Sequence, residues 1–433
     1  MGRYYHCMAQ EKNRVVITGI GSILPNAYSV EEFWNKIKEG DSQIDFIKSF
    51  STDNFPIKIA AELKDFDYKK FIPKLNSQHA IHYNQETLAI MSAVEMAQRD
   101  AGFTKTSLDP TKVGFIDSSS RASLAWWEHA WAKYQEDPKA FHEIFNRYSV
   151  LMSMSSTPST LTAIFNNIQG FVTCISAACV GGHHAISLAF QAIRKGRAEV
   201  MYVGGHEFPI LKSVMSMYAD PESRVMSLES QSPKKGLRPY DLKRDGFVLG
   251  EGAMALCLER YEHAKARGAE MYAEVLGHLS YNESSHAYRM DLTGQKASAG
   301  LKKLLKISKR STEDVGYFCG HGTATHNNDL AESRALHLLY EGTSKSKIPP
   351  LGSIKPIFGH TFGAAGIINV AATALMLKNQ TLAPTINIEH PDPECDHDHV
   401  KEGSRKVENF HTAVSLGFAI GSQSSFVSLG VAE

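Results

Sequence analysis

Residues 171–207 read FVTCISAACVGGHHAISLAFQAIRKGRAEVMYVGGHE, and this stretch decides the fold class. Its first five residues form a mostly apolar run that predicts a strand, which ends among the small residues around Cys179. Residues 181–196 carry apolar side chains at helical spacing and end at Gly196, and residues 199–207 predict a second strand. A strand, a helix and a strand in this order are typical of an α/β protein.

The same alternation extends in both directions along the chain. Buried strands are predicted from residues 14, 113, 272 and 315, and helices over 31–39, 85–102, 296–307 and 367–378. Two strands near the end, from residues 411 and 425, are expected to pair as a hairpin. We therefore expect a largely parallel sheet with helices on both faces. Residues 121–168 are rich in aromatic residues, Ser and Met, which indicates a cap inserted over a site.

Bulk composition excludes several classes of function. The 433 residues hold 46 basic and 46 acidic side chains, so a net charge of +0 gives no argument for binding to nucleic acid or a membrane surface. The six cysteines form no C-x-x-C pair, which favours free thiols and a reducing compartment. Neither a signal-like segment nor a run of about 18 apolar residues is visible, so we expect a cytoplasmic protein.

Cys179 lies where a predicted strand ends and a predicted helix begins. The N-terminus of a helix offers free N–H groups and partial positive charge, which favour a thiolate, so we expect a lowered pKa and a strong nucleophile. Small neighbours on both sides leave room for a substrate. A buried packing cysteine is the alternative interpretation, since most free cysteines have that role.

Two further Gly-rich loops each place one histidine after a predicted strand. The first is GHGTAT at residues 320–325 and contains His321, and the second is SIKPIFGH at residues 353–360 and ends at His360. A lone His is usually a satisfied polar residue. A Cys and two His in three such loops instead indicate covalent acyl transfer.

These three segments resemble the signature of the elongating β-ketoacyl-acyl-carrier-protein synthases, within the thiolase-like superfamily. Further likeness lies in residues 14–21 (RVVITGIG), 238–253 (RPYDLKRDGFVLGEGA) and 390–400 (HPDPECDHDHV). It covers roughly residues 13–430. The resemblance implies a five-layer α-β-α-β-α fold with two similar halves, over residues 13–265 and 266–433. It also implies a dimer whose partner lines part of the acyl pocket.

The activity that the resemblance implies is a decarboxylative condensation. An acyl group moves from a phosphopantetheine thioester of an acyl carrier protein to Cys179. Malonyl carrier protein then loses CO2, and its enolate attacks the acyl thioester. The resemblance gives His321 and His360 the role of neutral N–H donors to the enolate oxygen. No metal or redox cofactor is expected.

The resemblance assigns supporting roles to other residues. Lys355 is expected to be a fixed positive charge paired with Glu332. The backbone N–H groups of Cys179 and Phe418 are expected to form a second oxyanion hole. The remaining expected site residues are an acidic partner, two pantetheine-binding hydroxyls, a position in the gate, and four basic residues for carrier docking: Asp329, Thr323, Thr325, Ile420, Arg224, Lys69, Lys70 and Lys74.

Three departures from the family pattern indicate a specialised enzyme. The gate reads GFAIGS at residues 417–422, where the family has two glycines after the Phe and an Asn at the end. A usually basic stretch reads NSQHAIHYN at residues 76–84, and His326 stands where Pro is usual. They favour a type II polyketide or polyene synthase, working as a homodimer or as a heterodimer with a chain-length-factor-like subunit.

Other interpretations stay open or are set aside. Primary fatty-acid elongation is the first alternative, and a pocket-shaping partner subunit without catalysis is the second. A thiolase acting on coenzyme A thioesters would need a second cysteine in a C-terminal motif. Cys395, His397 and His399 suggest a metal cluster, but the family carries none in this loop. No G-x-G-x-x-G context supports a dinucleotide site.

Overall fold

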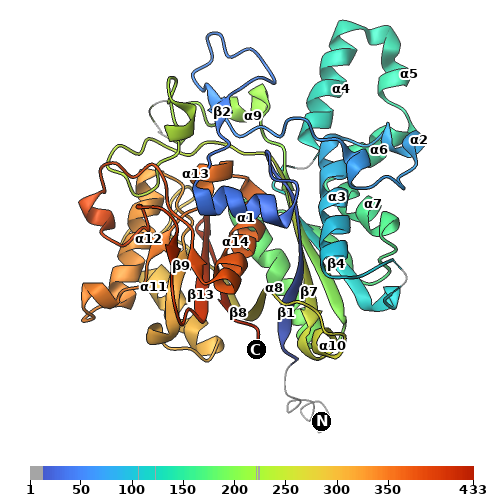
Figure 1. Ribbon diagram of the computed structural model, residues 1–433. Coiled ribbons are helices and arrows are strands. Elements are labelled where there is room, and N and C mark those ends of the chain that lie inside the picture. Colours follow the sequence, from blue (N-terminus) through green and yellow to red (C-terminus); the bar gives the residue numbers. More distant parts are fainter. Residues whose placement is uncertain (1–12, 106, 122, 221, 223–224) are drawn as a thin grey trace, which may run out of the picture.

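A computed structural model describes residues 13–433 except 106, 122, 221 and 223–224 (Figure 1). One mixed sheet runs through the described part of the chain in the order β10-β9-β13-β14-β8-β1-β7-β6-β4-β5. Its strands are β1 (Val15–Ile23), β4 (Val113–Ser118), β5 (Val172–Ile175), β6 (Val200–Glu207), β7 (Gly252–Arg260), β8 (Ala273–Asn282), β9 (Val315–Cys319), β10 (Leu351–Gly352), β13 (Thr412–Ala419) and β14 (Gln423–Gly430). Two short pairs lie outside it, β2 (Asp45–Phe46) with β3 (Ile59–Ala60) and β11 (Thr381–Leu382) with β12 (Arg405–Lys406).

The sheet consists of two halves built alike. Counted along the chain within each half, the strands stand in the order 3-2-4-5-1, both for β1 to β7 and for β8 to β14. The halves join where β1 meets β8, through Val16 opposite Glu274 and Ile17 opposite Ala273. This repetition confirms the two similar halves expected from the resemblance.

The two halves of the sheet form two of the five layers, and helices form the other three. The main ones are α1 (Val30–Glu39), α3 (Gln85–Asp100), α4 (Leu124–Glu136), α5 (Phe141–Ile144), α6 (Arg147–Met152), α7 (Thr157–Phe165), α8 (Gly181–Arg194), α10 (Tyr261–Ala266), α11 (Gln295–Ile307), α12 (His326–Leu339), α13 (Lys355–Phe358) and α14 (Ala365–Asn379). Helices α3 and α7 cover the first half, α11 and α12 cover the second, and α8 and α14 lie between the halves (Figure 1). The α-β-α-β-α arrangement is thereby confirmed.

The expectation of a largely parallel sheet is wrong. Strands β4, β5 and β6 are parallel, but β7 pairs antiparallel with both β6 and β1. In the second half β14 is antiparallel to β13 and to β8. The reason is that β6 to β7 and β13 to β14 connect without a crossover helix, and only a crossover makes consecutive strands parallel. The terminal hairpin is confirmed.

The sequence did not predict several of the helices, and the longest of these are α12 and α4. Helix α12 was not predicted because polar residues, including Asn328, Asp329 and Glu332, interrupt the apolar residues on its buried face. Helix α4 projects from the body of the molecule, and Ala130 is its one buried residue (Figure 1). Its aromatic side chains pack on one another and on α5. Neither helix therefore shows the apolar periodicity of a core helix.

The two central helices approach each other closely at glycine positions. A Cβ on Gly182 of α8 would lie 2.8 Å from the backbone nitrogen of Ile367, and one on Gly366 of α14 would lie 2.7 Å from that of His183. Only glycine allows this approach. Because Cys179 lies just before α8 and His360 lies shortly before α14, the contact brings these two side chains together.

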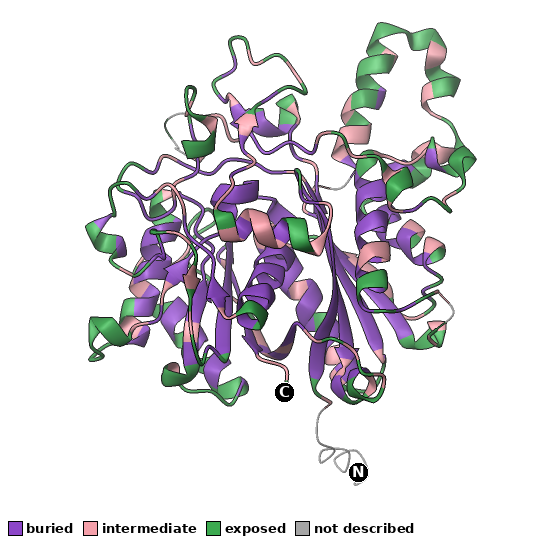
Figure 2. Cartoon of the chain, viewed as in Figure 1, coloured by how far each residue is buried: buried purple, intermediate pink, exposed green. Residues whose placement is uncertain are grey.

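The central layer is the most deeply buried part of the molecule (Figure 2). Its segment Phe362–Asn379 is long and apolar enough to cross a membrane, with a mean hydropathy of 1.2, yet 89% of it is buried inside the fold. A helix that packs between the two halves of the sheet needs apolar residues all round. Its position therefore accounts for its composition.

Candidate active site

The backbone around Cys179 forms a tight turn between β5 and α8. Cys179 is the middle residue of a single 3-10 turn, Ala178–Val180, and α8 begins at Gly181. Ala178 has a φ of 45°, in the left-handed region, which costs about 1–2 kcal/mol for a residue with a Cβ. The rest of the fold holds this strained turn, which aims the sulfur away from the strand.

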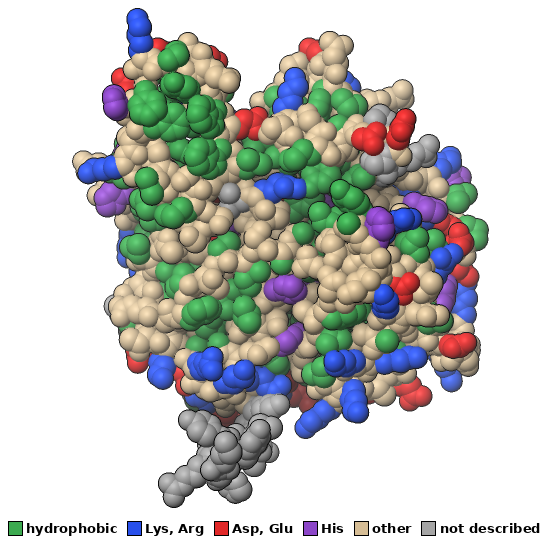
Figure 3. Space-filling model, turned by 180° about the vertical axis from the view of Figure 1, so that it is seen from behind, with side chains coloured by type: hydrophobic (Ala, Val, Ile, Leu, Met, Phe, Trp, Pro, Cys, Tyr) green, Lys and Arg blue, Asp and Glu red, His purple; other side chains and the backbone are tan. Residues whose placement is uncertain are grey.

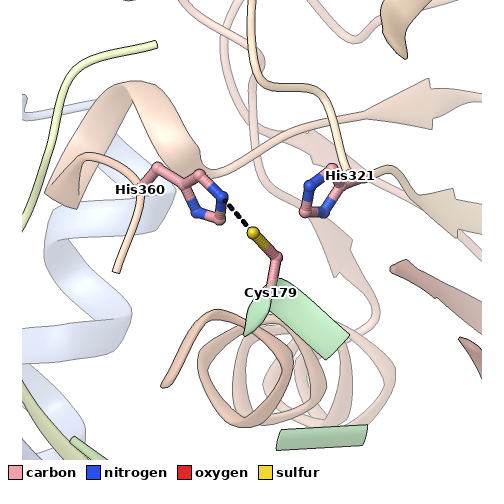
Figure 4. A group of neighbouring side chains, drawn as sticks. All are labelled: Cys179, His321 and His360. Atoms are coloured by element: carbon pink, nitrogen blue, oxygen red, sulfur yellow. Dashed lines mark hydrogen bonds between the residues drawn. The ribbon is translucent and has the colours of Figure 1, made fainter. Parts of the chain in front are cut away.

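Cys179, His321 and His360 converge on one point (Figure 4). Sγ of Cys179 lies 3.1 Å from Nε2 of His360. The two imidazole rings are 5.2 Å apart and perpendicular, at 86°. One ligand-type atom from each residue lies within 4.8 Å of the others, so this set also has the donors to hold a soft divalent cation.

Both histidines are neutral. Burial, followed by the nearby charge of Lys355, lowers the pKa of each well below its ordinary value. Neutral imidazoles suit N–H donation to an oxygen that gains negative charge. Nδ1 of His360 is buried and has no hydrogen-bond partner in the described part of the chain, so the contact of Nε2 with the Cys179 thiol sets the tautomer.

The expectation of a lowered pKa at Cys179 is wrong. Burial raises the pKa of its thiol to about 12, and the charges of Lys355 and Arg121 offset this only in part. Desolvation of a thiolate outweighs the helix terminus here. Cys179 therefore rests as a thiol, and its proton has an acceptor in Nε2 of His360, 3.1 Å away.

Lys355 is buried beside the first histidine loop. Its ammonium group donates a hydrogen bond to the backbone oxygen of His321, and burial lowers its pKa. The expected ion pair with Glu332 is absent, although both residues are described. The reason is that Glu332 accepts from the backbone N–H groups of His321, at 2.8 Å, and Gly322, at 2.7 Å.

The acidic pair on α12 holds the loop that carries His321. Asp329 accepts hydrogen bonds from the backbone N–H of Thr323 and of Tyr240, and Asn328 donates to both acids. Burial raises the pKa of Asp329 and Glu332, and the charge of Asp329 further raises that of Glu332. These acids shape the loop and do not face the thiol.

The segment between β6 and β7 positions both histidine loops, which the sequence did not reveal. The backbone N–H of His360 donates to Val248 at 2.7 Å, and Gly246 donates to Ala324 at 3.0 Å. Arg244 is buried and pairs with Asp392 at 2.6 Å and Asp329 at 3.8 Å. Residues 238–253 carried part of the resemblance, so this likeness was the available signal.

The gate residues lie at the hairpin of β13 and β14. Phe418 is buried, with its ring 6.3 Å from that of His321. Ile420 is 52% exposed at the turn, so its side chain does not reach the site in this conformation. Ser422 donates to the backbone oxygen of His286 at 2.7 Å and accepts from its N–H at 2.9 Å. The Asn-to-Ser departure thus ties the gate to a neighbouring loop.

The remaining expected residues differ in how close they lie to the thiol. The hydroxyls of Thr323 and Thr325 share a hydrogen bond of 2.9 Å beside the His321 loop. Lys69, Lys70 and Lys74 are exposed around a 3-10 turn that precedes α3. The expectation about Arg224 falls outside the described residues.

Glu207 is a buried acid that sequence reasoning did not single out. Its carboxylate accepts from the backbone N–H groups of Ser120, Arg121 and Gly363, each at 2.9 Å. It therefore clamps the loop after β4 to the turn that follows His360. The only available signal was its place at the end of a buried strand.

The sequence matches two family models along most of its length. "Beta-ketoacyl synthase, N-terminal domain" matches residues 12–264, and "Beta-ketoacyl synthase, C-terminal domain" matches residues 272–389. The chain is 33% identical over 428 residues to the 3-oxoacyl-[acyl-carrier-protein] synthase 2 of Vibrio harveyi, covering 98% of this chain and all of the relative.

Solved structures agree with the family models. A type II polyketide synthase acyl-carrier protein in complex with its ketosynthase, bound to the hexaketide, gives a TM-score of 0.87 at 28% identity, covering 97% of this chain and 100% of that one. The ishigamide ketosynthase/chain length factor gives 0.86 at 25% identity, covering 97% and 99%. Together with the site, these matches show that the chain belongs to the β-ketoacyl synthase family and is a condensing enzyme.

Proposed function

We propose that the chain condenses an acyl group on Cys179 with malonyl carrier protein to give a β-ketoacyl carrier protein. The observation that carries the proposal is the 3.1 Å contact between Sγ of Cys179 and Nε2 of His360, with His321 across from it. The same observation disfavours a non-catalytic partner subunit, which would not need this geometry.

In the first half-reaction the sulfur of Cys179 attacks the thioester carbon of an acyl carrier protein. The new S–C bond forms, the bond to the carrier sulfur breaks, and the thiol proton passes through His360 to the departing carrier thiolate. Backbone N–H groups of Cys179 and Phe418 receive the oxyanion. Thr323 and Thr325 hold the phosphopantetheine arm.

In the second half-reaction malonyl carrier protein loses CO2 to give an enolate. His321 and His360 donate N–H bonds to its oxygen, and Lys355 supports His321 as a fixed charge. The enolate carbon bonds to the acyl carbon, the bond to Cys179 breaks, and the released thiolate takes up a proton. Decarboxylation drives the reaction, so neither a metal nor a redox cofactor is required.

The pathway proposed is type II polyketide or polyene biosynthesis, with primary fatty-acid elongation as the alternative. The gate residues Ala419, Ile420 and Ser422, with the uncharged stretch at 76–84, depart from the housekeeping pattern. Similar structures include a ketosynthase with its carrier protein and a ketosynthase/chain length factor. A division into halves at about residue 265 and a cytoplasmic location stay predictions.

We also propose a dimer, either of two copies or with a chain-length-factor-like subunit. Strand β5 ends the sheet order, so one of its edges has no partner strand in the described residues. Exposed Phe171 and Leu188 lie near it. Further large apolar side chains, including Trp127 and Trp131, are exposed on the projection of α4 and α5, where Figure 3 shows hydrophobic side chains gathered. Lys69, Lys70, Lys74 and Arg224 are proposed to contact the acidic carrier protein.

The test of the reaction separates its two steps. Cys179→Ala is expected to abolish condensation and acylation, whereas His321→Ala and His360→Ala should lose about 10²–10³ in malonyl decarboxylation and keep some acylation. Intact-protein mass spectrometry measures acylation, and labelled CO2 release measures decarboxylation. Product from the Cys179 variant, acylation at another cysteine, or normal CO2 release by a His variant would contradict the assigned role.

A further inference from the structure

Arg121 is a half-buried cation that the mechanism above does not use. It follows β4, and its backbone N–H donates to Glu207 at 2.9 Å. The guanidinium lies over two aromatic rings, 5.4 Å from the centre of Tyr218 and 5.5 Å from the centre of Phe362. One of its nitrogens, Nη2, donates a hydrogen bond to the hydroxyl of Tyr218.

No counter-ion of this cation lies among the residues that the structure describes. Among the residues that the structure describes, no carboxylate oxygen lies within 4.0 Å of the guanidinium, even though Glu207 contacts the backbone of the same residue. The Nε atom is buried and has no hydrogen-bond partner in that part of the chain. A buried, unpaired donor is unfavourable unless a ligand satisfies it.

The guanidinium lies beside the nucleophile. The Phe362 ring that it covers is 5.2 Å from the ring of His360, which contacts Cys179. Phe362, Tyr218 and Cys179 belong to one apolar cluster, which also contains Met215 and Phe247. The charge of Arg121 is close enough to lower the pKa of the Cys179 thiol. A fixed donor group therefore stands within the apolar surroundings of the sulfur.

Building on the proposed function, we infer that Arg121 and Tyr218 form a specificity site for an acceptor oxygen on the acyl chain, such as the keto oxygen of a β-ketoacyl group. An oxygen there completes the hydrogen bonding of the buried Nε atom. A fully reduced chain would bury the same cation against methylene groups, which is unfavourable. A site built to hydrogen-bond a substrate group discriminates strongly against the analogue that lacks it.

The experiment compares two acyl donors of equal length on the whole protein. Hexanoyl and 3-oxohexanoyl carrier protein are offered separately, and acylation of Cys179 is followed by intact-protein mass spectrometry. The quantity of interest is the ratio of the two rates in each variant. Loss of the charge from Arg121 changes the reactivity of the thiol for both donors alike, so a ratio cancels that effect.

The variants are Arg121→Leu, Arg121→Lys and Tyr218→Phe, with exposed Arg197→Leu as the matched control. Arg121→Leu is expected to lower the oxo-to-hexanoyl ratio about ten- to a hundredfold, as for loss of a charged hydrogen bond. Arg121→Lys should keep much of the ratio, Tyr218→Phe should lower it less, and Arg197→Leu should match the wild type.

Two outcomes would overturn the inference, and only the second would also overturn the proposed function. A wild-type ratio that Arg121→Leu and Tyr218→Phe both leave unchanged defeats the specificity site alone, since acylation still occurs. Absence of Cys179 acylation by either donor in the wild type defeats the proposed function and the inference with it. The conservative variants keep the test valid if Arg121→Leu folds poorly.

Discussion

At the position of Cys179 two electrostatic effects oppose each other. The N-terminus of α8 and the charge of Lys355 favour a thiolate, whereas burial favours the thiol and raises the pKa to about 12. The thiol is therefore the resting form at neutral pH, and the histidine beside it is neutral as well. Proton transfer belongs to the moment of attack and is not completed beforehand.

This balance predicts the pH dependence of alkylation at Cys179. Because burial raises the pKa of the thiol to about 12, its thiolate fraction should grow about tenfold per pH unit between pH 7 and 10, without a plateau. The rate of iodoacetamide modification at Cys179, mapped by peptide mass spectrometry, measures this. A small free thiol, which levels off above pH 8.5, is the control. A plateau below pH 8 would show that the helix terminus and Lys355 lower the pKa of the thiol by more than burial raises it.

At the scale of elements, the contact between α8 and α14 sets the catalytic distance. A Cβ on Gly366 would lie 2.7 Å from the backbone nitrogen of His183. Such a short contact can be relieved only if one of the two helices moves away from the other. Separation of the helices would carry Cys179 and His360 apart, since each lies just before one of them. The geometry of the site thus depends on two residues that have no side chain.

We accordingly predict that Gly366→Ala lowers kcat/KM about a hundredfold and destabilises the protein by about 1–3 kcal/mol. Urea denaturation and the condensation assay measure the two effects. Gly430→Ala is the matched control, because the added Cβ there would meet only the flexible end of Leu276, at 3.0 Å. Equal activity of the two variants would show that the contact between the helices does not set the catalytic geometry.

At the scale of the whole molecule, a net charge of +0 does not indicate which surface binds a partner. The exposed Lys69, Lys70 and Lys74 are proposed for carrier docking, and the edge of β5 is proposed for dimer formation. Both surfaces belong to the first half of the fold. A related subunit at the edge of β5 would add its own charges to the docking surface, so the two contacts are best tested together.

We expect a mass near twice the 47.8 kDa of one chain, and higher activity with a chain-length-factor-like subunit than without it.

Reversing the three lysines to Glu should raise the KM for carrier protein at least tenfold at low salt, and added salt should weaken wild-type binding. Light scattering and steady-state kinetics measure these effects, with exposed Lys302→Glu as control. A fully active homodimer with no gain from a partner would defeat the heterodimer. A KM unchanged by the reversals and by salt would defeat the docking surface.

Local sequence determined which residues are proposed to carry the chemistry and most of the elements that hold them. Strand runs, helical spacing and Gly-rich loops depend on neighbours along the chain, so β5, α8 and the loops of His321 and His360 were predictable. The resemblance supplied the two similar halves. Helix α12 was not predictable, because polar residues interrupt its buried face and are satisfied by backbone groups of the His321 loop and of Tyr240.

Only the tertiary structure decided the electrostatics and the strand directions. The pKa of Cys179 depends on desolvation by residues from several segments, which outweighs the local helix terminus. Lys355 contacts the backbone of His321 instead of Glu332, because the carboxylate is already occupied by backbone N–H groups. Arg121 meets Tyr218 and Phe362 across 97 and 241 residues of chain. Such contacts join segments that lie far apart in the chain, and the contact between Arg121 and Phe362 also joins the two halves, so no local pattern encodes them.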